Sequence, residues 1–413
     1  MNTLLRANLF LLLLVAVFDP VDQTHLKAPL FVGVWILFLT DIAISRHGRY
    51  QVPANLYLYM FIFVVFLPLM GLLIYLLRGG GMEGYEGFKY WKSYLFLTLC
   101  IPVAVKRLDL SRPLSIVLSL LSVATICLYL IALSDDLLRA QLTAFADAYV
   151  VFSVTDRSYG SLSYQSVYFH GTPLIVIAIA YFCYQSLRST GRAKLWNVLF
   201  LMLNVCGMVL SGSRNNMIVG LLTPLMVMGW YTGTKTRVAI AVLLVLVVIA
   251  GFSSGVFQAM LSPYDDSNAI KLAHLHDYGI LFGDWKTLLF GQGLGASFFS
   301  TAWGTRVTLT EVTYLEFIRN YGLMLAPIFY FLILYPLRML ADPEARADHY
   351  LFLAYGAYLY MCSGNPLLLS SSGMLVLAVV LVKTFCNIVA IPRRLTVANV
   401  GVLSTGNLPP ALG

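Results

Sequence analysis

The sequence predicts an all-α polytopic membrane protein, and composition, hydropathy and charge distribution each point to it. Of its 413 residues, 59% are hydrophobic and 11% are charged, and the mean hydropathy is +0.81. A soluble domain carries about 25% charged residues. A soluble core of this size cannot hide so much apolar surface, so the lipid bilayer must be the solvent for most of the chain.

Twelve apolar stretches approach the length of about 20 residues that an α-helix needs to cross a bilayer. The first is the weakest, since Arg6 and Asn8 interrupt it. Asp19 and Pro20 follow it instead of a small-residue cleavage site, so we expect an uncleaved signal anchor. The predicted spans are 4–19, 28–44, 55–77, 93–105, 114–133, 166–187, 195–212, 216–233, 238–257, 312–337, 351–368 and 372–391.

The basic residues predict the orientation of these spans. With the N-terminus inside, every short connection assigned to the inside carries at least two Lys or Arg residues, as the positive-inside rule requires. The net charge of +8 is then a membrane-topology signal, and no cluster of basic and aromatic residues suggests nucleic acid. Sixteen of the 27 basic residues fall inside: Arg6, Arg46, Arg49, Lys106, Arg107, Arg112, Arg188, Arg192, Lys194, Lys235, Arg237, Arg338, Arg346, Lys383, Arg393 and Arg394.

Two long segments, 134–165 and 258–311, are predicted outside the membrane. Long loops are usually functional or disordered. Short apolar runs in the second segment favour amphipathic helices lying on the outer surface. We expect one transmembrane domain over 1–394 and a flexible cytoplasmic tail over 395–413.

The six cysteines do not predict chemistry. None forms a Cys-x-x-Cys pair and each lies in or beside an apolar run, so we expect neither a disulfide framework nor a metal site. The six are Cys100, Cys127, Cys183, Cys206, Cys362 and Cys386.

The turn 211–216, Ser-Gly-Ser-Arg-Asn-Asn, joins two apolar spans at the outer face and is the first candidate site. Gly212 permits a tight turn, and Ser213 or Asn215 can cap the following helix. Exposed N–H groups at that helix start and the guanidinium of Arg214 favour a bound anion such as a diphosphate. The alternative is that Arg214 only anchors a helix end at the membrane surface.

The second candidate site is the stretch 310–322, which begins the tenth span. On a helix, Glu311, Tyr314 and Arg319 share one face, with Glu316 to one side. Ionisable groups at the mouth of a transmembrane helix normally face the protein interior or a wet cavity. The alternative is an internal ion pair between Glu316 and Arg319 at i,i+3, whereas Glu311 has no local partner.

The loop residues His274, His276 and Arg306 are weaker candidates. His-x-His spacing lacks a third metal ligand, so exposure or a substrate contact is expected instead. His170 is a similar candidate, for which a hydrogen-bonded buried histidine is favoured. Arg157 in the other outer segment is taken as a substrate-binding residue. The glycine-rich run 291–295 follows no predicted strand, which excludes a nucleotide fingerprint.

Three features together resemble the O-antigen polymerase/ligase family of bacterial envelope glycan assembly. They are the turn 211–216 with Arg214, the loop run 289–295 (Leu-Phe-Gly-Gln-Gly-Leu-Gly), and the stretch 311–322 that enters the next helix. The pattern covers roughly residues 195–340. The resemblance implies a membrane-embedded C-type glycosyltransferase that needs no metal or cofactor and acts on undecaprenyl-diphosphate glycans at the outer face of the bacterial inner membrane.

The resemblance further favours a polymerase over a ligase. The ligases carry a His-Asn-x-Tyr-Leu-like stretch, whose end matches Thr313-Tyr314-Leu315, but Glu311 stands where the ligase histidine would be. The chemistry of the candidate site predicts the role of general base for Glu311 and of diphosphate stabilisation for Arg214, helped by Arg319 or Arg306. Tyr314, His276, Asn215, Glu316 and Arg157 are expected to contact substrate.

The expected partners are lipid-linked oligosaccharides and membrane lipids, with a chain-length regulator and a flippase. The alternative functions are an O-antigen ligase that transfers glycan to lipid A core, or a lipid-linked oligosaccharide flippase. Against a flippase, the polar residues gather at the outer face and the sequence shows no internal repeat.

Overall fold

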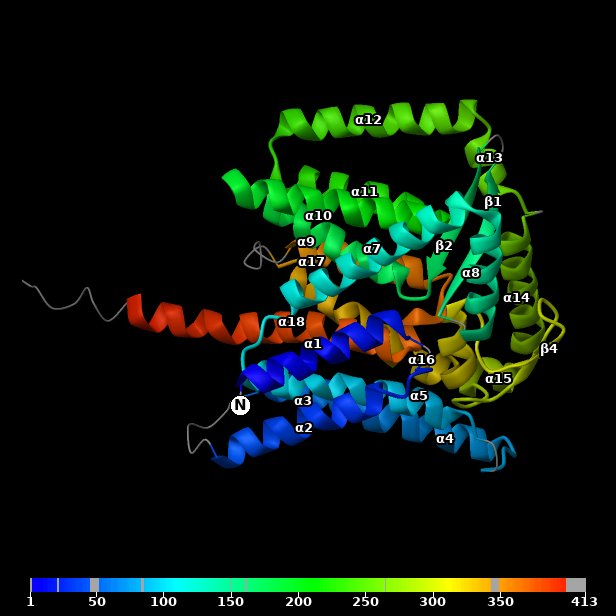
Figure 1. Cartoon of the computed structure of the whole chain (residues 1–413). Coiled ribbons are helices and arrows are strands. Elements are labelled where there is room, and N and C mark those ends of the chain that lie inside the picture. Colours follow the sequence, from blue (N-terminus) through cyan, green and yellow to red (C-terminus); the bar gives the residue numbers. More distant parts are fainter. Residues whose placement is uncertain are drawn as a thin grey trace, which may run out of the picture.

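The computed structural model describes residues 2–20, 22–44, 52–82, 85–149, 151–159, 162–263, 265–342 and 349–398. Most of these residues are helical, and the long helices run side by side in one bundle (Figure 1). The first half comprises α1 (Asn2–Phe18), α2 (Lys27–Ile44), α3 (Ala54–Phe61), the π-helix η1 (Ile62–Phe66), α4 (Leu67–Leu77), α5 (Gly87–Tyr94), η2 (Leu95–Leu99), α6 (Cys100–Val105), α7 (Ser111–Ser134) and α8 (Asp136–Tyr149).

The second half adds two small antiparallel hairpins to the helices. Its elements are β1 (Phe152–Tyr159), β2 (Leu162–Phe169), η3 (Thr172–Leu174), α9 (Ile175–Arg188), α10 (Gly191–Leu210), α11 (Arg214–Tyr231), α12 (Thr234–Ser253), α13 (Val256–Leu261), α14 (Asp266–Gly283), α15 (Trp285–Phe290), β3 (Phe298–Ser300), β4 (Thr305–Val307), α16 (Thr313–Leu340), α17 (His349–Cys362), η5 (Pro366–Leu369) and α18 (Ser371–Ala398).

Six helices in the described ranges are long and apolar enough to cross a membrane. The strongest case is α12, whose hydropathy is 2.4 although none of its residues is buried inside the protein. An apolar helix without a protein core around it needs an apolar solvent. The membrane character predicted from composition is thus supported by structure. The six are Lys27–Ile44, Ala54–Leu77, Ser111–Ser134, Gly191–Leu210, Thr234–Ser253 and Thr313–Leu340.

The predicted start of the sixth span, 166–187, is wrong. Its first residues belong to β2, which pairs with β1 along its whole length. Apolar and polar residues alternate over 162–165 (Leu-Ser-Tyr-Gln), a strand pattern that lies just before the predicted span. The helix that follows, α9, has 14 residues and measures about 21 Å, less than the roughly 30 Å of the hydrocarbon core.

Two prolines shape the long helices without leaving polar groups unpaired. Pro68 and Pro336 have no N–H to donate to Val64 and Leu332, the residues four positions earlier. The freed carbonyls accept hydrogen bonds from other helices, Val64 from Trp91 Nε1 at 2.9 Å and Leu332 from the Tyr59 hydroxyl at 2.6 Å. These bonds connect α5 to the π-helical turn η1, and α3 to α16. Backbone polar groups inside a lipid bilayer need such partners within the protein, because no water is available to them.

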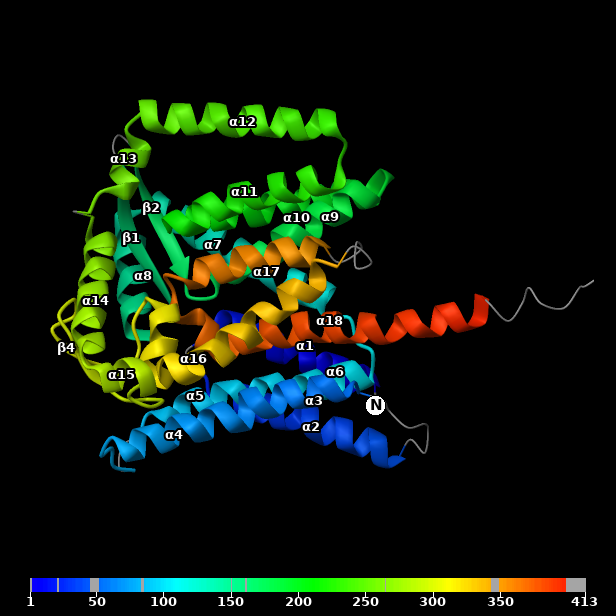
Figure 2. The same ribbon diagram turned by 180° about the vertical axis from the view of Figure 1, so that it is seen from behind.

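The two ends of the bundle differ in structure. The ends of α9 and α11 and the starts of α10 and α12 gather at one end, at the left in Figure 1. The helices α8, α14 and α15 and both hairpins lie at the other end, as Figure 2 shows from behind. The segments predicted outside the membrane are therefore together, and they contain the short helices that the sequence predicted.

Some predictions fall on residues outside the described ranges. Arg46, Arg49 and Arg346, the C-terminal part of the predicted tail (399–413) and residues 343–348 are among them. α18 itself continues to Ala398, beyond the predicted span end at 391 and the domain boundary at 394. Among the side chains that the structure describes, five cysteines are free: Cys100, Cys127, Cys183, Cys206 and Cys362.

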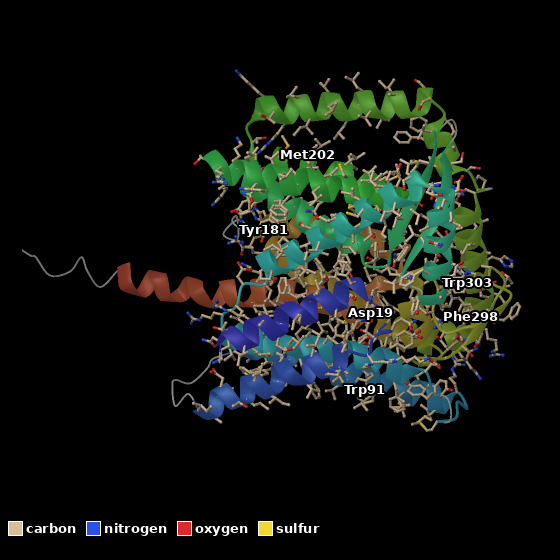
Figure 3. All side chains as sticks on the ribbon, viewed as in Figure 1. Asp19, Trp91, Tyr181, Met202, Phe298 and Trp303 are labelled. Carbon is tan, nitrogen blue, oxygen red and sulfur yellow. The ribbon has the colours of Figure 1, made fainter. Side chains whose placement is uncertain are left out.

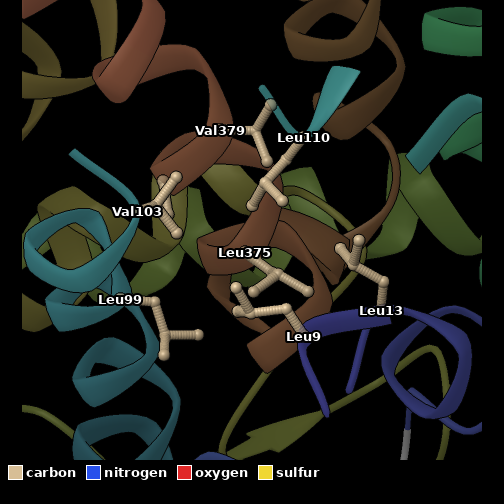
Figure 4. A pocket seen from close by; sticks show the side chains of 8 residues that line it. Leu9, Leu13, Leu99, Val103, Leu110, Leu375 and Val379 are labelled. Atoms are coloured by element: carbon tan, nitrogen blue, oxygen red, sulfur yellow. The ribbon is translucent and has the colours of Figure 1, made fainter. Parts of the chain in front are cut away.

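A small cavity of about 10 Å³ lies among α1, η2, α6 and α18 (Figure 4). Every residue that lines it is apolar, so it offers no group for binding a polar ligand or for catalysis. These residues are Leu9, Leu13, Leu99, Val103, Leu110, Leu375, Ala378 and Val379.

The sidedness of the membrane is a testable prediction. In a cysteine-free background, we expect Lys286→Cys on α15 to react with an impermeant thiol reagent added outside intact cells. Lys235→Cys at the start of α12 should react only after the cells are opened, because basic connections stay inside. Both side chains are exposed. Labelling of Lys286→Cys from the cytoplasm alone would place the long segment on the wrong side.

Candidate functional site

A polar cavity of about 490 Å³ occupies the end of the bundle that carries the hairpins. Six parts of the chain form its walls: the β1–β2 hairpin with the residues after it, the α10–α11 turn, the α13–α14 region, the β3–β4 turn, the loop before α16, and the end of α17 with the link after it. The lining residues are Arg157, Tyr168, His170, Pro173, Gly212, Ser213, Arg214, Asn215, Asn216, Ile218, Met260, Leu261, Ser267, Asn268, Lys271, Trp303, Glu311, Tyr360, Met361, Gly364, Asn365 and Pro366.

The charges in this lining are unbalanced. Arg157, Arg214 and Lys271 supply three permanent or easily formed positive charges, and Glu311 supplies the one carboxylate among the described residues that line the cavity. A concave site with low-dielectric walls concentrates the field of such charges. The cavity is therefore suited to an anion, with one group beside it able to accept a proton.

Gly212 brings the α10–α11 turn against the hairpin. Its φ of +70° is a conformation that side chains disfavour, and a Cβ there would lie 2.3 Å from Cβ of Ser166 and 3.3 Å from Cγ of Arg157. The predicted need for glycine in this turn is confirmed. Ser213 occupies the N-cap position of α11 as predicted, but its side chain makes no capping hydrogen bond.

Arg214 lines the cavity but already has protein partners. Its Nη2 forms an ion pair with Asp265, and its Nη1 donates to the carbonyl of Met260. The partners lie at the end of α13 and at the N-cap of α14, so the turn and the long outer segment are joined through this guanidinium. Asn215, the neighbouring predicted residue, lines the same cavity.

Arg157 reaches the cavity from β1, opposite Tyr164 of β2. Its Nε is buried and has no hydrogen-bond partner among the described residues. A buried donor without a partner costs free energy, which a ligand oxygen in the cavity can recover. Arg157 is therefore the strongest candidate for direct anion binding.

Lys271 of α14 is a site residue that the sequence did not single out. A Cβ placed on Gly364 would lie 3.3 Å from Lys271 Nζ and 3.7 Å from Asn215 Nδ2, so α11, α14 and the link after α17 meet here. Burial lowers the pKa of Lys271, and the charge of Glu311 opposes that change. The available signal was a single lysine in an otherwise uncharged turn of the long outer segment.

Glu311 lies just before α16 with its side chain in the cavity lining. Burial raises its pKa, while the positive charges of Lys271 and Arg157 oppose the rise. The backbone on either side is held, since Thr310 N donates to Glu316 at 2.8 Å and Thr313 Oγ1 donates to Asn365 O at 2.9 Å.

Glu316 and Arg319 form the internal ion pair that the sequence left as the alternative. Both side chains have 0% exposure, and Arg319 Nη2 lies 2.6 Å from Glu316 Oε2. Glu316 also accepts the Tyr278 hydroxyl at 2.7 Å, and Arg319 donates to the carbonyls of Ala296 at 2.6 Å and Thr308 at 2.7 Å. Neither residue lines the large cavity; the pair fixes the loop that carries Glu311.

The glycine-rich run 291–295 packs against a break in α16, and it also holds the outer loop against the helix bundle. Gly322 has a φ of +66°, and this kink leaves the carbonyls of Arg319 and Asn320 available to the loop. Gln292 N donates to the first at 2.6 Å and Gly293 N to the second at 3.1 Å. A Cβ on Gly293 would lie 2.4 Å from Tyr75 N, so the close approach of this loop to α4 requires glycine.

Three other predicted substrate-binding residues lie outside the cavity lining. Tyr314 donates its hydroxyl to Leu359 O at 2.7 Å and packs in the core of α16 and α17. Arg306 on β4 is exposed beside Ser297, and His276 is exposed on α14. His170, by contrast, lines the cavity, as does Trp303.

Trp303 covers a buried histidine. His274 is completely buried, with its ring centroid 4.7 Å from that of Trp303, and neither of its ring nitrogens has a hydrogen-bond partner in the described part of the chain. Figure 3 places Trp303 at the end of the bundle that carries α14 and β4. The sequence predicted an exposed position or a substrate contact for His274. This side chain is buried instead, because α14 directs it inward beneath the β3–β4 turn.

Within the described ranges, no group of three or more His, Cys, Asp or Glu side chains has an arrangement suited to a metal ion. Comparison of the chain with known protein families, curated proteins and solved structures finds no match. The site must therefore be interpreted from its own geometry and charges.

Proposed function

We propose that this protein is a glycosyltransferase that polymerises lipid-diphosphate-linked oligosaccharide repeat units at the outer face of a bacterial cytoplasmic membrane. One observation carries the proposal: among the described residues, three cations from separate segments line one cavity together with a single carboxylate, the half-buried Glu311, at one end of a bundle of apolar helices. A lipid diphosphate needs this combination of membrane access and positive charge.

The cations would hold the donor. Its leaving group, undecaprenyl diphosphate, gains negative charge as the bond from the anomeric carbon to the phosphate oxygen breaks. Fixed positive charges in a cavity shielded from water stabilise such charge strongly. Arg157 and Lys271 are best placed for this role, together with Arg214 once it exchanges its protein partners.

Glu311 would activate the acceptor, a sugar hydroxyl at the non-reducing end of a second lipid-linked unit. The hydroxyl oxygen bonds to the anomeric carbon, its proton moves to Glu311, and the electron pair of the broken bond leaves with the diphosphate. Its burial makes Glu311 a better base than an exposed carboxylate. A chain-length regulator and a flippase are the expected protein partners.

The proposal includes the finer architecture. The shorter apolar helices Asn2–Phe18, Thr172–Arg188 and Ser371–Phe385 would add spans to the six longer ones, towards the twelve that the sequence predicts. The arrangement would be that of a membrane-embedded C-type glycosyltransferase.

The test is extension of a lipid-linked repeat unit by the purified protein in liposomes. A ladder of longer glycans still attached to lipid diphosphate supports polymerisation. Transfer to lipid A core alone would indicate a ligase, and movement of the unit across the bilayer without extension would indicate a flippase; both outcomes reject the proposal.

The Lys271→Met variant should extend the lipid-linked unit about 10²–10³-fold more slowly, the range typical for loss of one group that stabilises transition-state charge. Met matches the apolar length of the side chain, so α14 should still fold. Lys286→Met is the matched control, because Lys286 lies in the same outer segment, is exposed and does not line the cavity. Equal rates for the two variants would remove Lys271 from the site.

A further inference from the structure

Arg214 holds an internal anion at the edge of the cavity. The ion pair with Asp265 is only partly exposed, with 13% of the Arg214 side chain and 26% of the Asp265 side chain accessible. Carboxylate and phosphate oxygens use the same guanidinium donors, since both accept forked N–H bonds. The Asp265 carboxylate thus occupies a position that a ligand phosphate would take.

The same carboxylate begins a helix. Asp265 is the N-cap of α14, and its Oδ1 accepts both the Arg214 Nη2 and the backbone N–H of Ser267, the latter at 3.0 Å. Asn268 adds a second tie, donating to Ser262 O at 2.7 Å and Met260 O at 3.2 Å. The first turn of α14 is therefore anchored to α11 through Arg214.

This first turn also forms a wall of the cavity. Ser267, Asn268 and Lys271 all line it, and Lys271 is one of its cations. If a ligand phosphate binds the Arg214 guanidinium, the Asp265 carboxylate loses its ion-pair partner and lies beside the newly bound anion. Repulsion between the two negative charges would then move the start of α14, and Lys271 with it.

We propose that Asp265 occupies the phosphate subsite of the cavity in the ligand-free protein, and that a diphosphate displaces it from Arg214 and releases the first turn of α14. The inference rests on the proposed function only in requiring that the ligand carries a diphosphate. Arg214 then has two exclusive partners, and ligand binding is coupled to the position of Lys271.

The Asp265→Asn variant tests whether a diphosphate replaces Asp265 as the partner of Arg214. Asparagine caps a helix as well as aspartate does, so α14 keeps its N-cap while the competing charge is removed. We expect inorganic diphosphate to bind Asp265→Asn about five-fold or more tightly than the wild type in nanodisc calorimetry, the lower end of typical coupling between linked equilibria. The amide of Ser267 should exchange hydrogen faster when diphosphate is added to the wild type, with a smaller change in the variant.

Asp284→Asn is the matched control. Asp284 caps α15 through Lys286 N and Thr287 N and pairs with Arg78 at 3.6 Å, but it does not line the cavity. Its affinity for diphosphate should equal that of the wild type. Unchanged or weaker binding by Asp265→Asn, with binding by the wild type intact, would overturn the exchange alone. Absence of binding by every protein would overturn the exchange and the proposed anion site together.

A parallel titration with farnesyl diphosphate distinguishes the source of the anion. The same gain in Asp265→Asn, with tighter binding than inorganic diphosphate, supports exchange by a lipid-borne diphosphate. The same gain with equal affinities supports exchange by a soluble one. No gain with either probe overturns the exchange.

Discussion

Glu311→Gln should lower the rate of glycan extension about 10²–10⁴-fold, the usual cost of removing a general base, at normal abundance in the membrane. Glutamine keeps the size of the side chain but cannot accept the hydroxyl proton. Binding of the lipid-linked unit should be largely kept, because Arg157, Arg214 and Lys271 remain in the cavity.

The dependence of the rate on pH gives a second readout for Glu311. A base must be unprotonated, so the rate should rise as pH increases through its pKa. Burial raises that pKa, which places the acid limb of the wild-type profile above the ordinary range of a glutamate. Lys271→Met removes a charge that opposes the rise, so the limb should move to still higher pH.

The control for Glu311→Gln is Glu316→Gln. Glu316 is buried in the ion pair with Arg319, so its substitution should reduce the amount of folded protein and leave the pH profile of the remaining activity in place. Near-normal extension by Glu311→Gln at normal abundance would exclude Glu311 as the base.

Arg319→Met should destabilise the protein by about 3–5 kcal/mol, because it leaves the Glu316 carboxylate buried without its cation. The carbonyls of Ala296 and Thr308 lose their donor as well. The measurements are thermal unfolding of the purified protein and its abundance in the membrane.

The double variant Arg319→Met with Glu316→Gln separates a structural role from a substrate-binding one. Removing both charges should restore part of the lost stability, since no unpaired buried charge remains. Arg157→Met, the comparison in the cavity, should lose activity and keep its stability. A stable but inactive Arg319→Met protein would instead support the substrate-binding role predicted from the sequence.

Much of this protein follows from the sequence because the relevant physics is local or compositional. The bilayer requirement follows from the excess of apolar residues, and α12 illustrates it with no buried residue at all. The i,i+3 spacing of Glu316 and Arg319 made their ion pair foreseeable, since three residues on a helix bring side chains together. Gly212 was foreseeable too, because a turn without a loop demands a backbone that only glycine readily adopts.

The tertiary structure decided which charges share a cavity. Lys271 and Glu311 meet only because α14 folds back over the end of the bundle, and Arg214 meets Asp265 through the same path of the chain. Such partners have no fixed sequence spacing, so no local pattern announces them. The end of the β1–β2 hairpin depended on tertiary pairing in the same way, since residues 166–169 run directly into an apolar stretch and only the hydrogen bonds to the neighbouring strand mark them as strand.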